Sequence, residues 1–369
     1  MYKKVKIIYV IPDYGKFGGI QALATDTAQM LQKKPSLYSV VQYGWHFKEI
    51  PLPVRALVRL SPSYLGRHVY ELIVAPHFND KFSLKGDIYH YWSLDSTLPY
   101  KVRPYVVSIH GLEILSGNLR GFRLKAYEKS LNGAEAIHSN SNYTKKLLLE
   151  TFPTVDPKKV IVINPAISKK DKYLSKRPQA GDKYVIGTLT RFVGRKNLPN
   201  IVKALTILKN QYGLEFIYYL AGDGPKRKSI LRELAKSGIE YKYLGKISDR
   251  DKTQKFYPKL DVFVLPPLQT NKDVEGFGIV FLEANASGVP VVASNTGGVS
   301  DAVKPNISGL FADPKNPESI AEKIYEILTS KKNYKKSSLD WVEEFSPENK
   351  MAQFEAFYAK ALKQAKRTD

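Results

Sequence analysis

The sequence predicts an α/β protein made of two doubly wound domains. Its 369 residues are more than one hydrophobic core usually serves. Short runs of β-branched and aromatic residues alternate with longer stretches of helical periodicity, as in parallel sheets with crossover helices. Residues 167–183 are charged and polar with almost no apolar periodicity, so we interpret them as an interdomain linker. We expect an N-terminal domain over residues 1–170 and a C-terminal domain over residues 181–345.

The N-terminal domain is expected to hold a sheet of short, mostly apolar strands. Apolar residues at helical spacing predict the connecting helices, the last of which follows the capping-type string SNSN. The segment 47–82 carries no motif that we can place. The predicted strands are residues 6–11, 39–43, 87–91, 105–109, 136–139 and 160–163, and the predicted helices are residues 20–33, 122–131 and 143–150.

The C-terminal domain repeats this alternation of strand and helix. Its predicted strands are residues 184–189, 215–221, 241–244, 262–265 and 289–293, and its predicted helices are residues 198–210, 226–236, 277–287 and 317–328. The last segment, residues 347–366, reads as one long amphipathic helix, which we expect to pack back on the N-terminal domain.

Composition and charge exclude several classes of protein. The chain has no cysteine, which excludes disulfides, thiolate metal sites and cysteine nucleophiles and suits a reducing compartment. The first apolar run ends at Pro12 without a cleavage site, and the chain has no apolar run of the roughly 18 residues that a spanning helix needs. The net charge of +22 attracts polyanions: nucleotides, anionic lipid or nucleic acid. We expect a cytoplasmic protein that can contact the cytoplasmic face of a membrane peripherally.

The most informative string is EGFGIVFLEA, which runs from Glu275 to Ala284. Its glycines stand where a predicted helix opens, and free backbone N–H groups there suit sugar hydroxyls and diphosphate oxygens. Eight residues of helix rise about 12 Å, so Glu275 and Glu283 can reach opposite ends of an extended ligand such as a nucleotide sugar. The alternative is structural: one glutamate favoured by the helix dipole and another on a solvated face.

Two further strings lie at strand ends in the second half of the chain. The string TRFVGRKN, residues 190–197, follows the first strand, at the edge where open α/β sheets bind ligands. Its cations Arg191, Arg195 and Lys196 suit a departing diphosphate, although a plain basic turn is the alternative. The string AGDGP, residues 221–225, is a turn-forming run that is weak by itself.

The first half of the chain has two comparable strand ends. The string GKFGGIQ, residues 15–21, allows backbone to approach a phosphate or a sugar closely. It is not a GxGxxG, and no Walker A motif is present, so kinase and ATPase functions lose support. His110 ends the strand PYVVSIH at a carboxyl edge, where a catalytic and a structural role are both open.

The ordered set of motifs resembles the family 4 retaining glycosyltransferases of the GT-B fold, in which two Rossmann-like domains face each other across a cleft. The motifs are GGIQ, SIHG, RFVGRKN, AGDGP, EGFGIVFLEA, SGVPVVAS and TGGVSD, and they cover nearly the whole chain. The resemblance implies transfer of a hexose-type sugar from a UDP- or GDP-sugar to an acceptor hydroxyl, on a glycan or a lipid-linked molecule. The stretch PPLQTNKDV before Glu275 departs from the family pattern, which puts the acceptor side in doubt.

The resemblance assigns a role to each matching residue. Arg191 and Lys196 match the pair that binds the donor diphosphate, Glu275 the acid near the donor sugar, and Glu283 the acid that bonds the ribose. Lys246 and Ile247 fall where the base lies, and His110 beside the transferred sugar. The implied catalytic residues are Glu275, Arg191, Lys196 and His110, and the implied donor-binding residues are Gly18, Gly19, Gly222, Lys246, Ile247, Gly276, Phe277, Gly278 and Glu283.

The residues favour one mechanism and leave alternatives open. Phosphate clamps without an obvious nucleophile favour front-face displacement, in which the leaving diphosphate accepts the acceptor's proton; the alternative is double displacement through Glu275. No Asp-x-Asp element stands in a convincing position, so we expect no metal and no cofactor. A nucleotide-sugar epimerase or phosphorylase of GT-B fold would share the clamps. A basic nucleic-acid-binding protein is disfavoured, because no recognised reading module is present and we expect no nucleic-acid partner.

Overall fold

A computed structural model describes residues 4–11, 19–44, 85–97, 102–117, 119, 121–167 and 183–368. The chain divides into two compact units, Met1–Ala166 together with Glu348–Asp369, and Ile167–Pro347. Most of the expected linker, and the segment 47–82 for which no motif was found, lie outside the described residues. Among the residues that are described, none of the helices is both long and apolar enough to cross a membrane.

The first unit is built on a six-stranded parallel sheet in the order β2-β1-β3-β4-β5-β6. The order reverses beside β1, which makes the carboxyl ends of β1 and β3 a topological switch point of the kind where open sheets bind ligands. The strands are β1 Val5–Ile11, β2 Tyr38–Gly44, β3 Ile88–Tyr91, β4 Tyr105–Ile109, β5 Ala136–Ser139 and β6 Val160–Val162, and the helices are α1 Gly19–Gln32, α5 Phe122–Gly133, α6 Asn142–Thr151 and α14 Pro347–Thr368, with short 3-10 turns at η4 Leu94–Thr97, η5 Leu112–Ile114 and η6 Pro157–Lys159.

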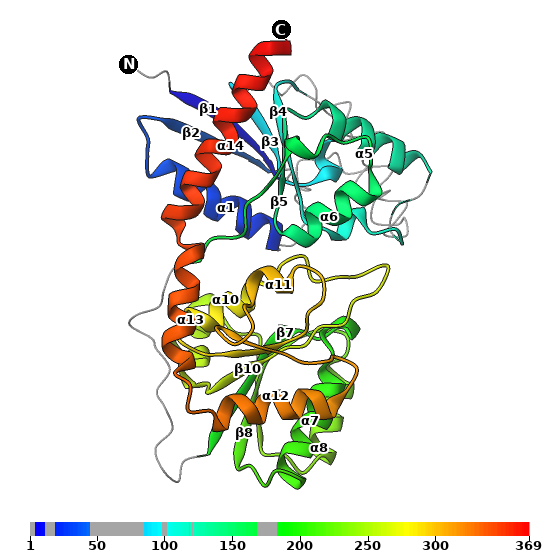
Figure 1. Ribbon diagram of the computed structural model, residues 1–369, viewed down its shortest axis with the longest axis vertical. Helices are drawn as coiled ribbons and strands as arrows, with labels where there is room; N and C mark the ends of the chain where they lie inside the picture. Colours follow the sequence, from blue (N-terminus) through cyan, green and yellow to red (C-terminus); the bar gives the residue numbers. More distant parts are fainter. Residues whose placement is uncertain are drawn as a thin grey trace, which may run out of the picture. The chain divides into compact units, whose positions relative to one another are not determined.

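Alternate residues of β1 supply two separate cores, as the two-residue period of a strand requires. Ile7 and Tyr9 pack with α1 and α14, whereas Ile8 and Val10 pack with α5 and α6 (Figure 1). The Ser141 hydroxyl accepts from the backbone N–H of Thr144, which confirms the capping role expected for the SNSN string.

A chain of buried polar side chains crosses the first sheet and ends on α14. His138 Nε2 lies 2.9 Å from the Ile163 carbonyl, which can only accept, so Nε2 carries the proton of a neutral ring. The other bonds then have one direction each. Ser108 donates to His138 Nδ1, His90 Nε2 donates to Ser108, Tyr358 donates to His90 Nδ1 and Tyr9 donates to Tyr358, over distances of 2.7, 2.7, 2.7 and 2.9 Å. Each of these groups is satisfied while both histidines are uncharged.

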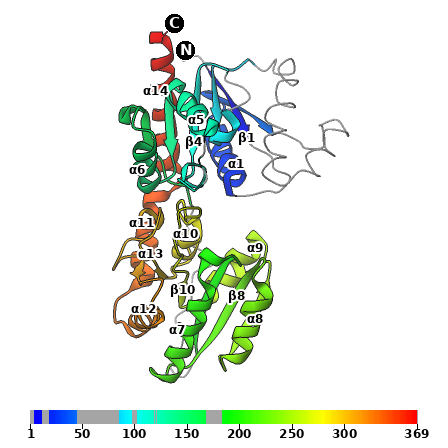
Figure 2. The same cartoon turned by 90° about the vertical axis from the view of Figure 1, so that its right-hand side faces the viewer.

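The second unit is also built on a six-stranded parallel sheet, in the order β12-β11-β10-β7-β8-β9. Helix α7 packs against both α12 and α8 (Figure 2). The strands are β7 Tyr184–Arg191, β8 Phe216–Asp223, β9 Tyr241–Gly245, β10 Val262–Val264, β11 Val291–Ala293 and β12 Gly309–Phe311, and the helical segments are η8 Gly194–Lys196, α7 Leu198–Asn210, α8 Arg227–Lys236, α9 Asp249–Asp251, η9 Lys252–Phe256, η10 Tyr257–Lys259, α10 Ile279–Asn285, α11 Val299–Ala302, α12 Pro317–Thr329, α13 Tyr334–Val342 and η11 Glu343–Phe345.

The two parallel sheets with their helices confirm the predicted α/β class. Several elements of the second unit differ from the prediction, and three of them show why. The expected helix 277–287 is shorter, because Gly278 has a φ of 91° and the helix α10 begins only at Ile279. Strand β12 has three residues and helix α13 carries the polar sequence YKKSSLDWV, so neither stands out by periodicity.

We expect His90, His110 and His138 to stay neutral across the physiological pH range. Burial lowers the pKa of His138 to about 3, that of His110 to about 4, and that of His90 well below its usual value. Their ring signals in a histidine-labelled NMR titration should therefore not move between pH 8 and about 5. Any of the three titrating near 6.5 would contradict the assignment.

The same shifts make the folded state weaker in acid. Between pH 6.5 and about 4 the unfolded chain binds protons that the folded chain does not, so the free energy of unfolding should fall by up to about 1.4 kcal/mol per pH unit for each of the three histidines. His138→Gln, which removes one titrating group, should flatten that slope.

Candidate active site

Most of the predicted site residues of the second unit gather at one edge of its sheet. Strand β7 ends at Arg191, β8 at Asp223 and β9 at Gly245, and parallel strands present their carboxyl ends on the same side. The turn η8 follows β7, and the EGFG loop opens α10. Arg191 itself is exposed, and the neighbouring Thr190 hydroxyl is buried with no hydrogen-bond partner in the described part of the chain.

Glu275 is the centre of an ion cluster at this edge. Its Oε2 accepts from Lys196 Nζ and, at 2.5 Å, from Arg195 Nη1. Arg195 Nε also pairs with Asp273 Oδ1 at 2.8 Å. Burial alone would raise the pKa of Glu275, but the two cations outweigh it and hold that pKa below its usual value. Burial lowers the pKa of Lys196, and the Glu275 carboxylate opposes that shift.

Backbone contacts of the string RKN, residues 195–197, explain why Arg195 and Lys196 lie beside Glu275. Asn197 has a φ of 60°, and its side-chain amide donates to the carbonyls of Pro266 and Pro314 at 3.1 and 2.6 Å. The Arg195 carbonyl accepts from the backbone N–H of Leu268 at 2.7 Å. The turn after β7 is therefore tied to the segment that leads to Glu275, and the departure PPLQTNKDV is part of this connection.

The TGGVSD string fixes the other side of the Glu275 loop. The backbone N–H of Gly298 donates to the Glu275 carbonyl at 2.8 Å. A Cβ on Gly297 would lie 2.4 Å from that carbonyl oxygen, so only glycine allows the two backbones to approach. Gly297 also donates to the Gln269 side chain at 3.0 Å.

Glu283, the second acid of the string, has different partners. Its Oε1 accepts from Lys252 Nζ at 2.9 Å and its Oε2 from the Tyr257 hydroxyl at 2.8 Å. Burial, and then the Glu283 charge, raise the pKa of Tyr257 well above its usual value, so the phenol stays a neutral donor. The two glutamates are thus held by separate sets of side chains.

The other predicted residues of the second unit are placed as follows. Gly222 has a φ of 121° and faces the Thr190 carbonyl so closely that a Cβ would lie 1.8 Å from it, which gives this glycine a packing role whatever its role toward ligand. The Phe277 side chain is 4% exposed and belongs to the core, so that of this residue the backbone alone can face a ligand. Lys246 is exposed, 4.0 Å from Asp223, and Ile247 is half-buried.

In the first unit, His110 follows β4, and hydrogen bonds hold both its ring and its backbone. Its Nε2 donates to the Trp92 carbonyl at 3.0 Å, and its backbone N–H donates to Glu113 Oε1 at 2.7 Å. With its pKa lowered to about 4 by burial, the ring is neutral and Nδ1 can accept a hydrogen bond. Gly19 is the first residue of α1, and Gly18 lies outside the described residues.

Three side chains in these contacts, Asp273, Lys252 and Tyr257, were not singled out from the sequence, and Arg195 was named among the cations without a role of its own. Arg195 stands in the basic string and Asp273 two residues before Glu275, so both had a signal in their proximity to the motifs. Lys252 and Tyr257 are five residues apart, a spacing that an α-helix would not place on one carboxylate.

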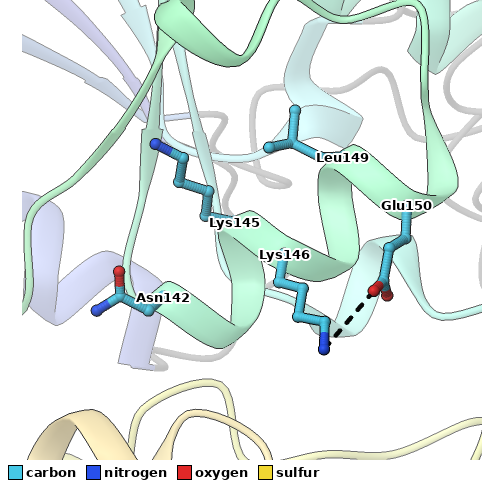
Figure 3. A pocket seen from close by; sticks show the side chains of 5 residues that line it. All are labelled: Asn142, Lys145, Lys146, Leu149 and Glu150. Atoms are coloured by element: carbon cyan, nitrogen blue, oxygen red, sulfur yellow. Dashed lines mark ion pairs between the residues drawn. The ribbon is translucent and has the colours of Figure 1, made fainter.

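A shallow pocket on α6 contains none of the predicted residues. It is lined by Asn142, Lys145, Lys146, Leu149 and Glu150 (Figure 3). Both lysines have partners: Lys145 donates to the Val160 carbonyl at 2.8 Å, and Lys146 lies 3.8 Å from Glu150.

We expect Glu275→Gln to destabilise the second unit, because it leaves Arg195 and Lys196 beside one another with less compensation. The cost should be about 3 kcal/mol, read as a lower melting temperature or urea midpoint. Asp273→Asn is the matched control: it removes a carboxylate from the same arginine, but that side chain is 41% exposed, so its cost should stay below about 1 kcal/mol. Equal losses in the two variants would argue against the cluster.

Comparison with known proteins supports the family resemblance that the motifs indicate. A model of Glycosyltransferase Family 4 matches residues 17–170, and a model of Glycosyl transferases group 1 matches residues 169–341. The chain is 28% identical over 249 residues to the uncharacterized glycosyltransferase MJ1607 of Methanocaldococcus jannaschii, covering 61% of this chain and 60% of that one. It is 32% identical over 160 residues to a GDP-mannose-dependent alpha-(1-6)-phosphatidylinositol monomannoside mannosyltransferase of Mycobacterium tuberculosis, covering 42% and 41%.

A solved structure extends the likeness in fold to both units. Anabaena HepE in complex with UDP matches with a TM-score of 0.71 at 19% identity, over 96% of this chain and 99% of that one. The alignments with the two curated relatives span 60% and 41% of those relatives' length. The family models, the curated relatives and the two parallel sheets agree, and the chain belongs to the family 4 glycosyltransferases of the GT-B fold.

Proposed function

We propose that the protein is a retaining hexosyltransferase that moves a sugar from a UDP- or GDP-sugar to an acceptor hydroxyl. The observation that carries the proposal is the cluster of Arg195, Lys196 and Glu275 at the carboxyl edge of the second sheet. Cations and a carboxylate at that edge suit a ligand with a diphosphate and a sugar next to each other.

The first step of the proposal is capture of the diphosphate. Exposed Arg191 offers a planar fork, and the unpartnered Thr190 hydroxyl offers a hydrogen-bond donor beside it. Lys196 exchanges part of its contact with Glu275 for a phosphate oxygen, and Arg195 keeps the carboxylate compensated meanwhile. The helix dipole contributes less than expected, because α10 spans only seven residues.

The second step is transfer on the face that the diphosphate leaves. The acceptor oxygen bonds to the anomeric carbon as the carbon–oxygen bond to the diphosphate breaks, and a phosphate oxygen takes the acceptor's proton. Two cations on Oε2 lower the basicity of Glu275, which disfavours it as a nucleophile and favours this front-face path. A glycosyl adduct on Glu275, found by mass spectrometry, would refute it.

The acceptor is proposed to be a glycan or a lipid-linked molecule at the cytoplasmic face of a membrane. The +22 net charge favours contact with anionic lipid. The name of the mycobacterial relative states a phosphatidylinositol-based acceptor and GDP-mannose as donor, so these are the first pair to assay. Activity and binding that are indifferent to phosphatidylinositol vesicles would argue against a lipid-linked acceptor.

We expect a donor screen to identify one nucleotide sugar that the protein hydrolyses slowly without acceptor. GDP-mannose and UDP-glucose come first, and released nucleoside diphosphate is the measurement. Lys196→Met should lower kcat/KM by about 100-fold or more, as loss of a preorganised donor to developing charge does. Lys228→Met, on the exposed face of α8, is the control and should leave the rate unchanged. Conversion of the donor sugar into an epimer would instead indicate an epimerase, and transfer to inorganic phosphate a phosphorylase.

We propose that transfer needs no metal and no cofactor, with the arginine and lysine side chains neutralising the diphosphate. Within the described ranges no three histidine, aspartate or glutamate side chains cluster as metal ligands would. Activity in excess EDTA should equal activity in untreated buffer. Full loss in EDTA, restored by manganese or magnesium, would overturn this prediction.

A further inference from the structure

The two oxygens of Glu283 are each held by a side chain from the segment after β9. Lys252 Nζ bonds Oε1 at 2.9 Å and the Tyr257 hydroxyl bonds Oε2 at 2.8 Å. Tyr257 is 1% exposed, whereas the Glu283 side chain is 19% exposed. Both oxygens of Glu283 therefore have a fixed partner, and its side chain is still partly exposed to solvent.

An irregular turn brings these two partners together. The segment η9, Lys252–Phe256, is π-helical, and the backbone N–H of Tyr257 donates to the carbonyl of Lys252. In an α-helix, residues five apart point about 140° away from each other around the axis. Closing one turn with five residues puts them on the same side, and π-turns of this kind are frequent at functional sites.

The remaining acceptor capacity of Glu283 matches a vicinal diol. A carboxylate offers about four lone-pair sites, so each oxygen keeps about one free of the Lys252 and Tyr257 bonds. The ribose of a nucleotide presents two adjacent hydroxyl donors. Lys252 also pairs with Asp249 Oδ1 at 2.8 Å, which anchors its ammonium without burying it fully.

We propose that Lys252 and Tyr257 are positioning residues that align the Glu283 carboxylate on the ribose hydroxyls of the donor, and that the π-turn exists to place both of them. This inference rests on the proposed function. It separates the energy of ribose recognition from catalysis: the pair sets how tightly the nucleotide binds, and leaves the chemical step untouched.

The test compares each ribonucleotide with its deoxy analogue. Calorimetric Kd values are measured for UDP and GDP and for 2′-deoxy-UDP and 2′-deoxy-GDP, in the wild type, Tyr257→Phe, Lys252→Met and Glu283→Gln. In the wild type the deoxy analogue should bind about tenfold more weakly, since a hydrogen bond to a charged group is lost. Tyr257→Phe and Lys252→Met should each weaken the ribonucleotide several-fold, leave the deoxy analogue unchanged, and leave kcat at saturating donor unchanged.

The control variant is Lys255→Met, which lies in the same turn but is 73% exposed and pairs with Asp251. This variant should keep the wild-type ratio between the Kd of the deoxy analogue and the Kd of the ribonucleotide. If Tyr257→Phe and Lys252→Met each kept the wild-type ratio of the deoxynucleotide Kd to the ribonucleotide Kd, the inference would be overturned while the proposed function stands. A wild type that binds neither UDP nor GDP would overturn both. Because Tyr257 is buried, Lys252→Met provides the independent variant if the phenylalanine protein does not fold.

Discussion

The carboxylate of Glu275 is the group on which the ligand edge of the second sheet depends. It joins the turn after β7 to the loop before α10, two segments about eighty residues apart in sequence. Removing either side would leave charge at a poorly hydrated position, which is costly, so the two segments keep one relative arrangement. A diphosphate that enters this edge meets cations already in place.

The two acids of the EGFGIVFLEA string are held by different chemistry. Glu275 shares one oxygen between two cations, which makes it a weak base and a poor nucleophile. Glu283 meets one cation and one neutral hydroxyl, on separate oxygens, which leaves it directional lone pairs. The first arrangement suits a stabilising charge near a reacting sugar, and the second suits recognition of hydroxyl groups.

Elements with strong periodicity could be predicted from sequence, and those formed by tertiary contacts could not. The strand at Tyr105–Ile109 and the helix at Leu198–Asn210 have the predicted bounds, because each is a clear run of one period. Strand β12 has three residues, and it is a strand because β11 offers it a partner. Helix α10 is shorter than expected because a left-handed glycine precedes it.

Some residues of the candidate site could likewise be predicted from the sequence, and others could not. Motif glycines and charges stood out along the chain, although whether they bind ligand stays a prediction. Gly222 illustrates the limit, since its close approach to Thr190 is visible only once β7 and β8 are paired. Lys252 and Tyr257 could not be associated with Glu283, because their spacing becomes meaningful only in a π-turn.

Helix α14 sets the order in which the two units can be completed. The core of the first unit includes Phe354, Phe357 and Tyr358, and Tyr358 is a partner of both Tyr9 and His90. These residues are synthesised after the whole of the second unit, Ile167–Pro347. During synthesis on the ribosome, therefore, the face of the first sheet that α14 covers stays incomplete until the second unit has been made. The second unit can finish folding before the first unit does.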